Sequence, residues 1–188
     1  MLYQSFESNS CAICLVANLL NLYGLTCSRA EAAYLLGAST DSSMVGVTHA
    51  KLLSVIANQL CPKLSLGWNS LRRFSFDKVL RVIRIVCADG APAVLTFHIR
   101  HPRKRWFGLH CAIAMQAEDT GIHLIDSLGR RDGKQPNATI TSQKSTHGWV
   151  VVGAPVMVTE QPVRILDGLP RLPKTKRAQD ESYTNRAS

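Results

Sequence analysis

Apolar and small residues recur at helical spacing through the first part of the chain. They occupy positions 12, 15, 16, 19, 20 and 23, which predicts a first helix over residues 11–23 that ends before Gly24. Ser28-Arg29-Ala30-Glu31 has the Ser-x-x-Glu form of a capping box. We expect it to open a second helix that extends to about Leu36.

Two more helices are predicted further along. Thr48 precedes an amphipathic segment and is expected to cap a third helix over His49–Leu60, which Pro62 prevents from continuing. Ser75 opens a fourth helix that runs to Val86.

Strand patterns dominate the second half of the chain. Residues 92–99 predict one strand, and residues 110–117 and 121–126 flank a short turn and predict an antiparallel hairpin. Residues 148–159 predict one long strand or two short ones, because Gly153-Ala154-Pro155 interrupts them. Helices followed by antiparallel strands indicate the α+β class.

The composition changes again near the end of the chain. From about Arg164, proline, lysine, arginine, serine and asparagine dominate without apolar periodicity. The sequence therefore predicts one domain over residues 1–163 and a basic, flexible tail over residues 164–188.

Positive charge is the main feature of the composition. The 188 residues carry a net charge of +9, much of it in two clusters at 100–105 and 171–177. Solvated surface charge is the simpler interpretation, and an acidic partner for the basic loop or tail is the alternative. Nucleic acid is not expected as a ligand, since no recognition-helix, RNA-recognition or zinc-finger pattern accompanies the charge.

The cysteines and the N-terminus bear on the cellular compartment. Six cysteines at irregular spacing (positions 11, 14, 27, 61, 87 and 111) predict free thiols rather than a disulfide framework. No basic region precedes an apolar segment at the start, and no apolar run is long enough to span a membrane. We expect cytoplasmic synthesis without a signal peptide, with delivery by a specialised secretion system as an alternative.

Cys11 carries the strongest indication of chemistry. It follows the short polar residues Ser8-Asn9-Ser10 and so lies on the first turn of the first predicted helix. The helix dipole and the unpaired N–H groups at that end favour a thiolate. The alternatives are a small buried helix residue or, with Cys14, half of a metal-binding or redox pair.

A histidine and an aspartate lie on the predicted hairpin. A turn between residues 118 and 120 places Asp126 opposite a residue between His110 and about Ile113, within reach of a carboxylate–imidazole hydrogen bond. An early helical cysteine with a later histidine and aspartate on paired strands is the layout of papain-like cysteine enzymes.

His98 and His101 are the alternatives to His110 as a base. Both border the basic segment 100–105, and neither has an aspartate across a hairpin. With Cys11 and Cys14 they have the spacing of a Cys₂His₂ zinc site, but one half lies on a continuous apolar helix and the other runs into a basic loop. No strand precedes Cys11, which argues against a thioredoxin-like pair. We therefore expect no metal and no cofactor.

Five segments occur in an order that is typical of one enzyme family. They are Gln4 with Cys11-Ala12-Ile13-Cys14-Leu15, then Val45-Gly46-Val47-Thr48, Gly90-Ala91-Pro92-Ala93-Val94-Leu95, His110-Cys111-Ala112-Ile113 and Ile125-Asp126. Together they resemble the C39 family of papain-like peptidases, which process bacteriocin leaders. The chain differs in having Ala12 for the usual glycine and six residues rather than five between Gln4 and Cys11. It also lacks the family's transporter portions, so the resemblance is to a stand-alone enzyme.

The resemblance implies a papain-like fold, with N-terminal helices packed on an antiparallel sheet, and a catalytic triad. In it Cys11 is the nucleophile, His110 the general base and Asp126 the residue that orients the imidazole, while Gln4 stabilises the oxyanion. The implied activity is hydrolysis of a peptide or isopeptide bond in a peptide or protein substrate. Deamidation, transglutamination or acyl transfer by the same triad is an alternative, and so is a non-catalytic peptide-binding module.

Overall fold

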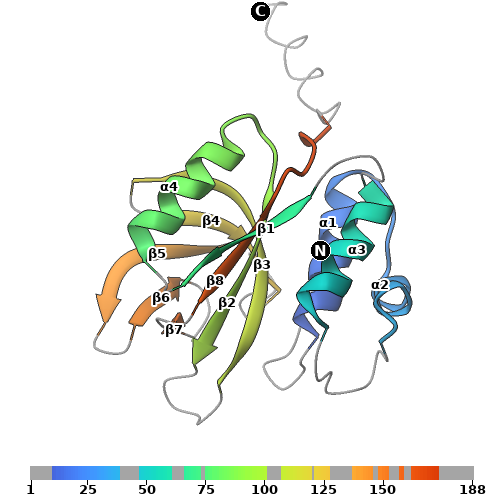
Figure 1. The fold of residues 1–188 in the computed structure, drawn as a ribbon, viewed down its shortest axis with the longest axis horizontal. Coiled ribbons are helices and arrows are strands. Elements are labelled where there is room, and N and C mark those ends of the chain that lie inside the picture. Colours follow the sequence, from blue (N-terminus) through green and yellow to red (C-terminus); the bar gives the residue numbers. More distant parts are fainter. Residues whose placement is uncertain are drawn as a thin grey trace, which may run out of the picture.

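The computed structural model describes residues 10–38, 47–60, 66–72, 75–100, 107–119, 121–127, 137–145, 148–152, 157–158 and 162–173. Within them lie four helices and eight strands (Figure 1). The helices are α1 (Cys11–Leu22), α2 (Arg29–Leu36), α3 (His49–Leu60) and α4 (Phe76–Cys87). The strands are β1 (Gly67–Leu71), β2 (Ala93–Arg100), β3 (Phe107–Glu118), β4 (Gly121–Ile125), β5 (Asn137–Ser145), β6 (Gly148–Val152), β7 (Met157–Val158) and β8 (Val163–Asp167).

All four predicted helices are confirmed, and local signals set their ends. The Ser28 side chain accepts a hydrogen bond from the N–H of Glu31, whose carboxylate accepts one from the N–H of Ser28. Gly37 ends α2 in the left-handed conformation, with φ of 66°. The Thr48 hydroxyl caps α3 by accepting from the N–H of Lys51. None of the described helices is both long and apolar enough to cross a membrane.

The strands form one antiparallel sheet in the order β1-β8-β2-β3-β4-β5-β6-β7. Because β7 also pairs with β2, strands β2 to β7 form a closed ring of pairings. The predicted strand 92–99 corresponds to β2, the predicted hairpin to β3 and β4, and the interrupted segment 148–159 to the two strands β6 and β7. Helices with an antiparallel sheet confirm the α+β class.

Helices lie on both sides of the sheet (Figure 1). α1, α2 and α3 lie together on one side, and their apolar core includes Cys111 and Ile113 of β3. α4 lies on the other side, over a core that includes Phe97 of β2 and Ala112 of β3. Successive residues of a strand point to opposite faces, so Cys111 and Ala112 belong to different layers.

The predicted start of the tail is wrong. Residues from 164 onward were expected to be flexible, but Val163–Asp167 forms β8, which lies in the sheet between β1 and β2. Beyond β8, the Tyr23 hydroxyl donates a hydrogen bond to the carbonyl oxygen of Pro170. The folded domain therefore extends past residue 163, and the remainder of the predicted tail, residues 174–188, lies outside the described residues.

Candidate active site

Cys11 is the first residue of α1, as the sequence predicts. The backbone carbonyl of Ser10 accepts the first helical hydrogen bond, from the N–H of Cys14, at 3.0 Å. Every residue of α1 from 13 to 20 is buried, so the core holds this helix on several sides. Cys11 itself is half-buried. Its thiol therefore sits on a fixed helix end at the edge of the core.

His110 lies on β3, and Asp126 directly follows β4. The pairing of Ile113 with Ile125 places Asp126 opposite Ala112, within the interval that the hairpin spacing predicts. His110 Nε2 lies 2.7 Å from Asp126 Oδ1, and each of the two side chains is 1% exposed. The predicted hydrogen bond between the imidazole and the carboxylate is thus confirmed.

Phe97 supports the His110 ring from the neighbouring strand. The two residues are partners in the β2–β3 pairing. Their rings meet edge to face, with centroids 5.5 Å apart and planes at 78°. Phe97 is fully buried, so this contact fixes the plane of the imidazole from within the core.

The thiol of Cys11 completes the arrangement. His110 and Cys111 lie close enough to shift its pKa, and its Sγ lies 3.9 Å from the carbonyl oxygen of Leu109. Since Asp126 engages Nε2 of His110, the other ring nitrogen, Nδ1, is the one left to exchange a proton with the thiol. Cys11 therefore lies beside a histidine that is itself hydrogen-bonded to Asp126.

These contacts change the proton affinities of the site. The side-chain interaction with Cys111 is the largest influence on the pKa of Cys11, and it lowers it. Together with the interaction and charge of His110 it outweighs burial, so the pKa of Cys11 is held well below its usual value. Burial opposes protonation of His110, but the charge and hydrogen bond of Asp126, together with Cys11, raise the pKa of His110 to about 10. Both shifts favour the thiolate–imidazolium form of the pair over the neutral form.

We expect iodoacetamide to alkylate Cys11 faster than the other cysteines of the folded protein, even at mildly acidic pH, because the thiolate is the reacting form. Burial raises the pKa of Cys14 and Cys27, and it raises that of Cys87 to about 11. Peptide mapping by mass spectrometry over a time course measures each rate. Labelling of Cys87 as fast as that of Cys11 would contradict the activated thiolate.

The other candidate residues fall as follows. Gln4 and His101 lie outside the described residues. His98 lies on β2 opposite Leu109, and burial lowers its pKa. The hydrogen bond to Asp126 is made by His110, which favours His110 as the base. In the described part of the chain, no group of three or more His, Cys, Asp or Glu side chains is placed to hold a metal ion.

Cys111 is the residue of the site that the sequence interpretation missed. It follows His110 directly, and alternation along β3 turns its side chain towards the α1 layer, where it packs with Ile113. No local signal indicated this, because alternation places Cys111 on the face of β3 opposite to His110, and its proximity to Cys11 depends on how α1 packs on β3.

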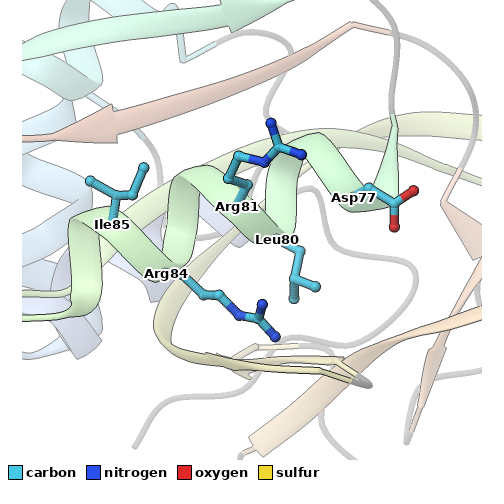
Figure 2. A pocket seen from close by; sticks show the side chains of 5 residues that line it. All are labelled: Asp77, Leu80, Arg81, Arg84 and Ile85. Atoms are coloured by element: carbon cyan, nitrogen blue, oxygen red, sulfur yellow. The ribbon is translucent and has the colours of Figure 1, made fainter.

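A hollow on the surface of α4 is separate from this site (Figure 2). It is lined by Asp77, Leu80, Arg81, Arg84 and Ile85. Arg84 also forms an ion pair with Asp119 at the end of the β3–β4 hairpin. α4 covers the face of the sheet opposite α1, so the hollow cannot form a cleft with Cys11.

Comparison of the sequence with known protein families gave no match, and neither did comparison with curated proteins. Function is therefore inferred from the geometry of Cys11, His110 and Asp126.

Proposed function

We propose that the protein is a papain-like cysteine peptidase of the C39-like type, which hydrolyses a peptide or isopeptide bond through a thioester on Cys11. The observation that carries the proposal is the placement of Cys11 beside His110, which is hydrogen-bonded to Asp126. The architecture supports it, because the helix that begins with the cysteine packs against β3, which carries the histidine, and the aspartate follows the adjacent strand. Papain-like enzymes likewise carry the cysteine on a helix and the histidine on the sheet.

In the first half of the reaction the Cys11 thiolate attacks the carbonyl carbon of the scissile bond. A carbon–sulfur bond forms, and the carbonyl electrons move to oxygen. Collapse of this intermediate breaks the carbon–nitrogen bond, and the His110 imidazolium gives its proton to the departing amine. The product is a thioester, with the amine fragment free to leave.

In the second half a water molecule enters in place of the amine. Neutral His110 takes a proton from this water, which attacks the thioester carbonyl, and the carbon–sulfur bond breaks. Release of the carboxylic acid restores the thiolate and the imidazolium. Asp126 holds the imidazole in one orientation and tautomer through both steps, as its 2.7 Å hydrogen bond to Nε2 requires.

The N-terminal turn of α1 supplies a donor for the oxyanion. The first N–H groups of a helix have no partner within the helix, and that of Cys11 lies next to its own sulfur. We propose the side-chain amide of Gln4 as the second donor, on the strength of the family resemblance.

Turnover is expected to follow a bell-shaped dependence on pH. It rises as the pH passes the lowered pKa of Cys11, because the thiol must lose its proton to attack. It falls as the pH passes the pKa of His110, raised to about 10, because the leaving amine needs the imidazolium proton. kcat/KM measured across the pH range tests both limbs. A single rise near about 6.5, the ordinary pKa of histidine, would contradict the ion pair.

Trapping the acyl-enzyme tests the proposal directly. The full chain is incubated with a peptide library and quenched in acid, and mass spectrometry of the intact and digested protein identifies any thioester. We expect an adduct on Cys11 that Cys11→Ala abolishes, whereas Cys14→Ala, which removes a buried thiol one turn along α1, keeps it.

The products separate the proposed reaction from its alternatives. New peptide carboxyl termini support hydrolysis, whereas release of ammonia identifies deamidation and a new amide bond identifies acyl transfer. Peptide binding with neither an adduct nor a product would show a non-catalytic module and overturn the proposal.

A further inference from the structure

Cys111 is a second thiol in direct contact with the proposed nucleophile. It lies on β3 with a side chain that is 6% exposed, and it packs in the same apolar cluster as Cys11. The two side chains lie close enough to shift each other's pKa although they are a hundred residues apart in the sequence. The contact joins the first turn of α1 to β3, two elements that pack together.

None of the other described cysteines lies on the sheet and faces Cys11. Cys14 lies one helical turn along α1, and Cys87 donates from the end of α4 to the carbonyl of Ala114, on the opposite side of the sheet. All five described cysteines, including Cys11 and Cys111, are free thiols in the structure. Cys111 is therefore the described cysteine on the sheet that faces Cys11.

The contact makes the two thiols unequal. The side-chain interaction with Cys111 lowers the pKa of Cys11, while the same interaction and burial hold the pKa of Cys111 well above its usual value. The thiolate form is therefore favoured at half-buried Cys11 and the protonated thiol at buried Cys111. A thiolate with a second thiol next to it is the arrangement of redox-sensing cysteines, in which the first is oxidised and the second resolves it.

We propose that Cys11 and Cys111 form a peroxide-responsive pair that closes to an intramolecular disulfide and reversibly switches off the active site. The effect on turnover rests on the proposed function, whereas disulfide formation itself does not. Half-buried Cys11 meets the oxidant first, and buried Cys111 acts as the resolving thiol.

The oxidation needs two steps and one molecule of hydrogen peroxide. The Cys11 thiolate attacks one peroxide oxygen, the O–O bond breaks, and the products are a sulfenic acid on Cys11 and hydroxide, which takes a proton to become water. The sulfur of Cys111 then attacks the sulfenic sulfur, an S–S bond forms, and the S–O bond breaks. The departing hydroxide leaves as water with the thiol proton of Cys111. The two sulfurs lose two electrons, which reduce the peroxide to two molecules of water.

The disulfide would inactivate the site because Cys11 no longer has a thiolate. It would also protect the nucleophile, since a sulfenic acid without a resolving thiol proceeds to sulfinic and sulfonic acids, which thiol reductants do not reverse. A dithiol such as dithiothreitol regenerates both thiols from the disulfide.

The test is a titration of the reduced full chain with hydrogen peroxide, followed by blocking of the remaining thiols with N-ethylmaleimide and peptide mapping without reductant. We expect a cross-linked peptide that contains Cys11 and Cys111, with a matching loss of iodoacetamide labelling at Cys11 that dithiothreitol restores. Cys87→Ala, which removes a thiol on the other side of the sheet, is the matched control and should cross-link like the natural chain.

Variants of Cys111 distinguish a resolving thiol from a merely neighbouring one. In Cys111→Ser, which keeps a hydrogen-bond donor of similar size, peroxide should drive Cys11 to the sulfinic acid, and dithiothreitol should no longer restore labelling. The natural chain alone decides the matter if the variant fails to fold. Oxidation of Cys11 to the sulfinic acid in the natural chain without a cross-link, or a cross-link from Cys11 to Cys14 or Cys61, would overturn the proposal.

The outcomes remain separate from those for the proposed function. The cross-link is read by mass and requires no substrate. If the chain forms the Cys11–Cys111 disulfide but cleaves no peptide, the redox pair is supported and the peptidase is refuted. If it cleaves peptides but forms no cross-link, the peptidase is supported and the redox pair is refuted.

Discussion

Replacing His110 by Ala is expected to lower kcat/KM by at least about 10⁴-fold and to remove the enhanced reactivity of Cys11. In the proposed mechanism His110 is the cationic partner of the thiolate and the proton donor to the leaving amine, so one change removes two functions. The two readouts are peptide turnover and the rate of iodoacetamide labelling as a function of pH. Labelling should require a more alkaline pH in the variant, because the pKa of Cys11 rises.

His98→Ala is the matched control, since His98 lies on the neighbouring strand and lacks the hydrogen bond to Asp126 that defines the proposed base. It should retain the labelling profile of Cys11. If His98→Ala abolished labelling at neutral pH and His110→Ala left it unchanged, the base would be misassigned.

Asp126→Asn is expected to lower turnover by about 10³- to 10⁴-fold while preserving the size of the side chain. The amide has no charge to stabilise the imidazolium and can hold the imidazole in the wrong tautomer. Because the charge of Asp126 helps to raise the pKa of His110, the alkaline limb of the pH profile should also move to lower pH. An unchanged alkaline limb would show that Asp126 does not act through His110.

The helices could be predicted because their signals are local. The ends of α2 are set by a capping box at Ser28 and a left-handed Gly37, and α3 follows the cap at Thr48. Each of these signals acts within a few residues and needs no partner elsewhere in the chain. The β3–β4 hairpin is similar, because a short turn fixes which residues face each other, and this allowed His110 and Asp126 to be placed together.

The outer strands could not be predicted in the same way. β1 and β8 pair with Gly67 opposite Asp167, a hundred residues apart in the sequence. No neighbouring segment therefore indicated a pairing partner for either strand. β8 also carries Arg164 between Val163 and Ile165 and follows Pro162, which made a five-residue strand look like the start of a polar tail. β5 was missed as well, and its partners β4 and β6 come from separate predicted segments.

The candidate site also combines features set by local signals with a feature set by long-range packing. The residues of the proposed triad could be placed from a helix start and a hairpin, both of which are local patterns. The contact between Cys11 and Cys111 depends on how α1 packs on β3, which sequence spacing does not encode. Recognising it requires the face of the strand as well as its position, because His110 and Cys111 are adjacent in sequence but turn to opposite sides.

Truncation after residue 163 is expected to abolish cooperative folding. It deletes β8, which pairs with both β1 and β2, so that β1 loses the strand it pairs with and β2 loses one of its neighbours. It also removes Ile165 and Leu166, which are fully buried in the α4 and α1 layers respectively. Loss of these contacts from both cores at once leaves apolar surface exposed on each face. Circular dichroism during heating should show no sharp transition for this fragment.

Two matched comparisons make the test specific. Deleting residues 174–188 keeps β8 and residues 168–173. Because the deleted segment lacks apolar periodicity, the melting temperature should be essentially unchanged. Within β8, Ile165→Ala should lower the free energy of unfolding by about 2–5 kcal/mol, whereas Arg164→Ala, at the exposed neighbouring position, should change it by only about 0.5 kcal/mol. If the chain truncated after residue 163 melted cooperatively at the temperature of the full chain, β8 would be dispensable and the domain would end where the sequence first indicated.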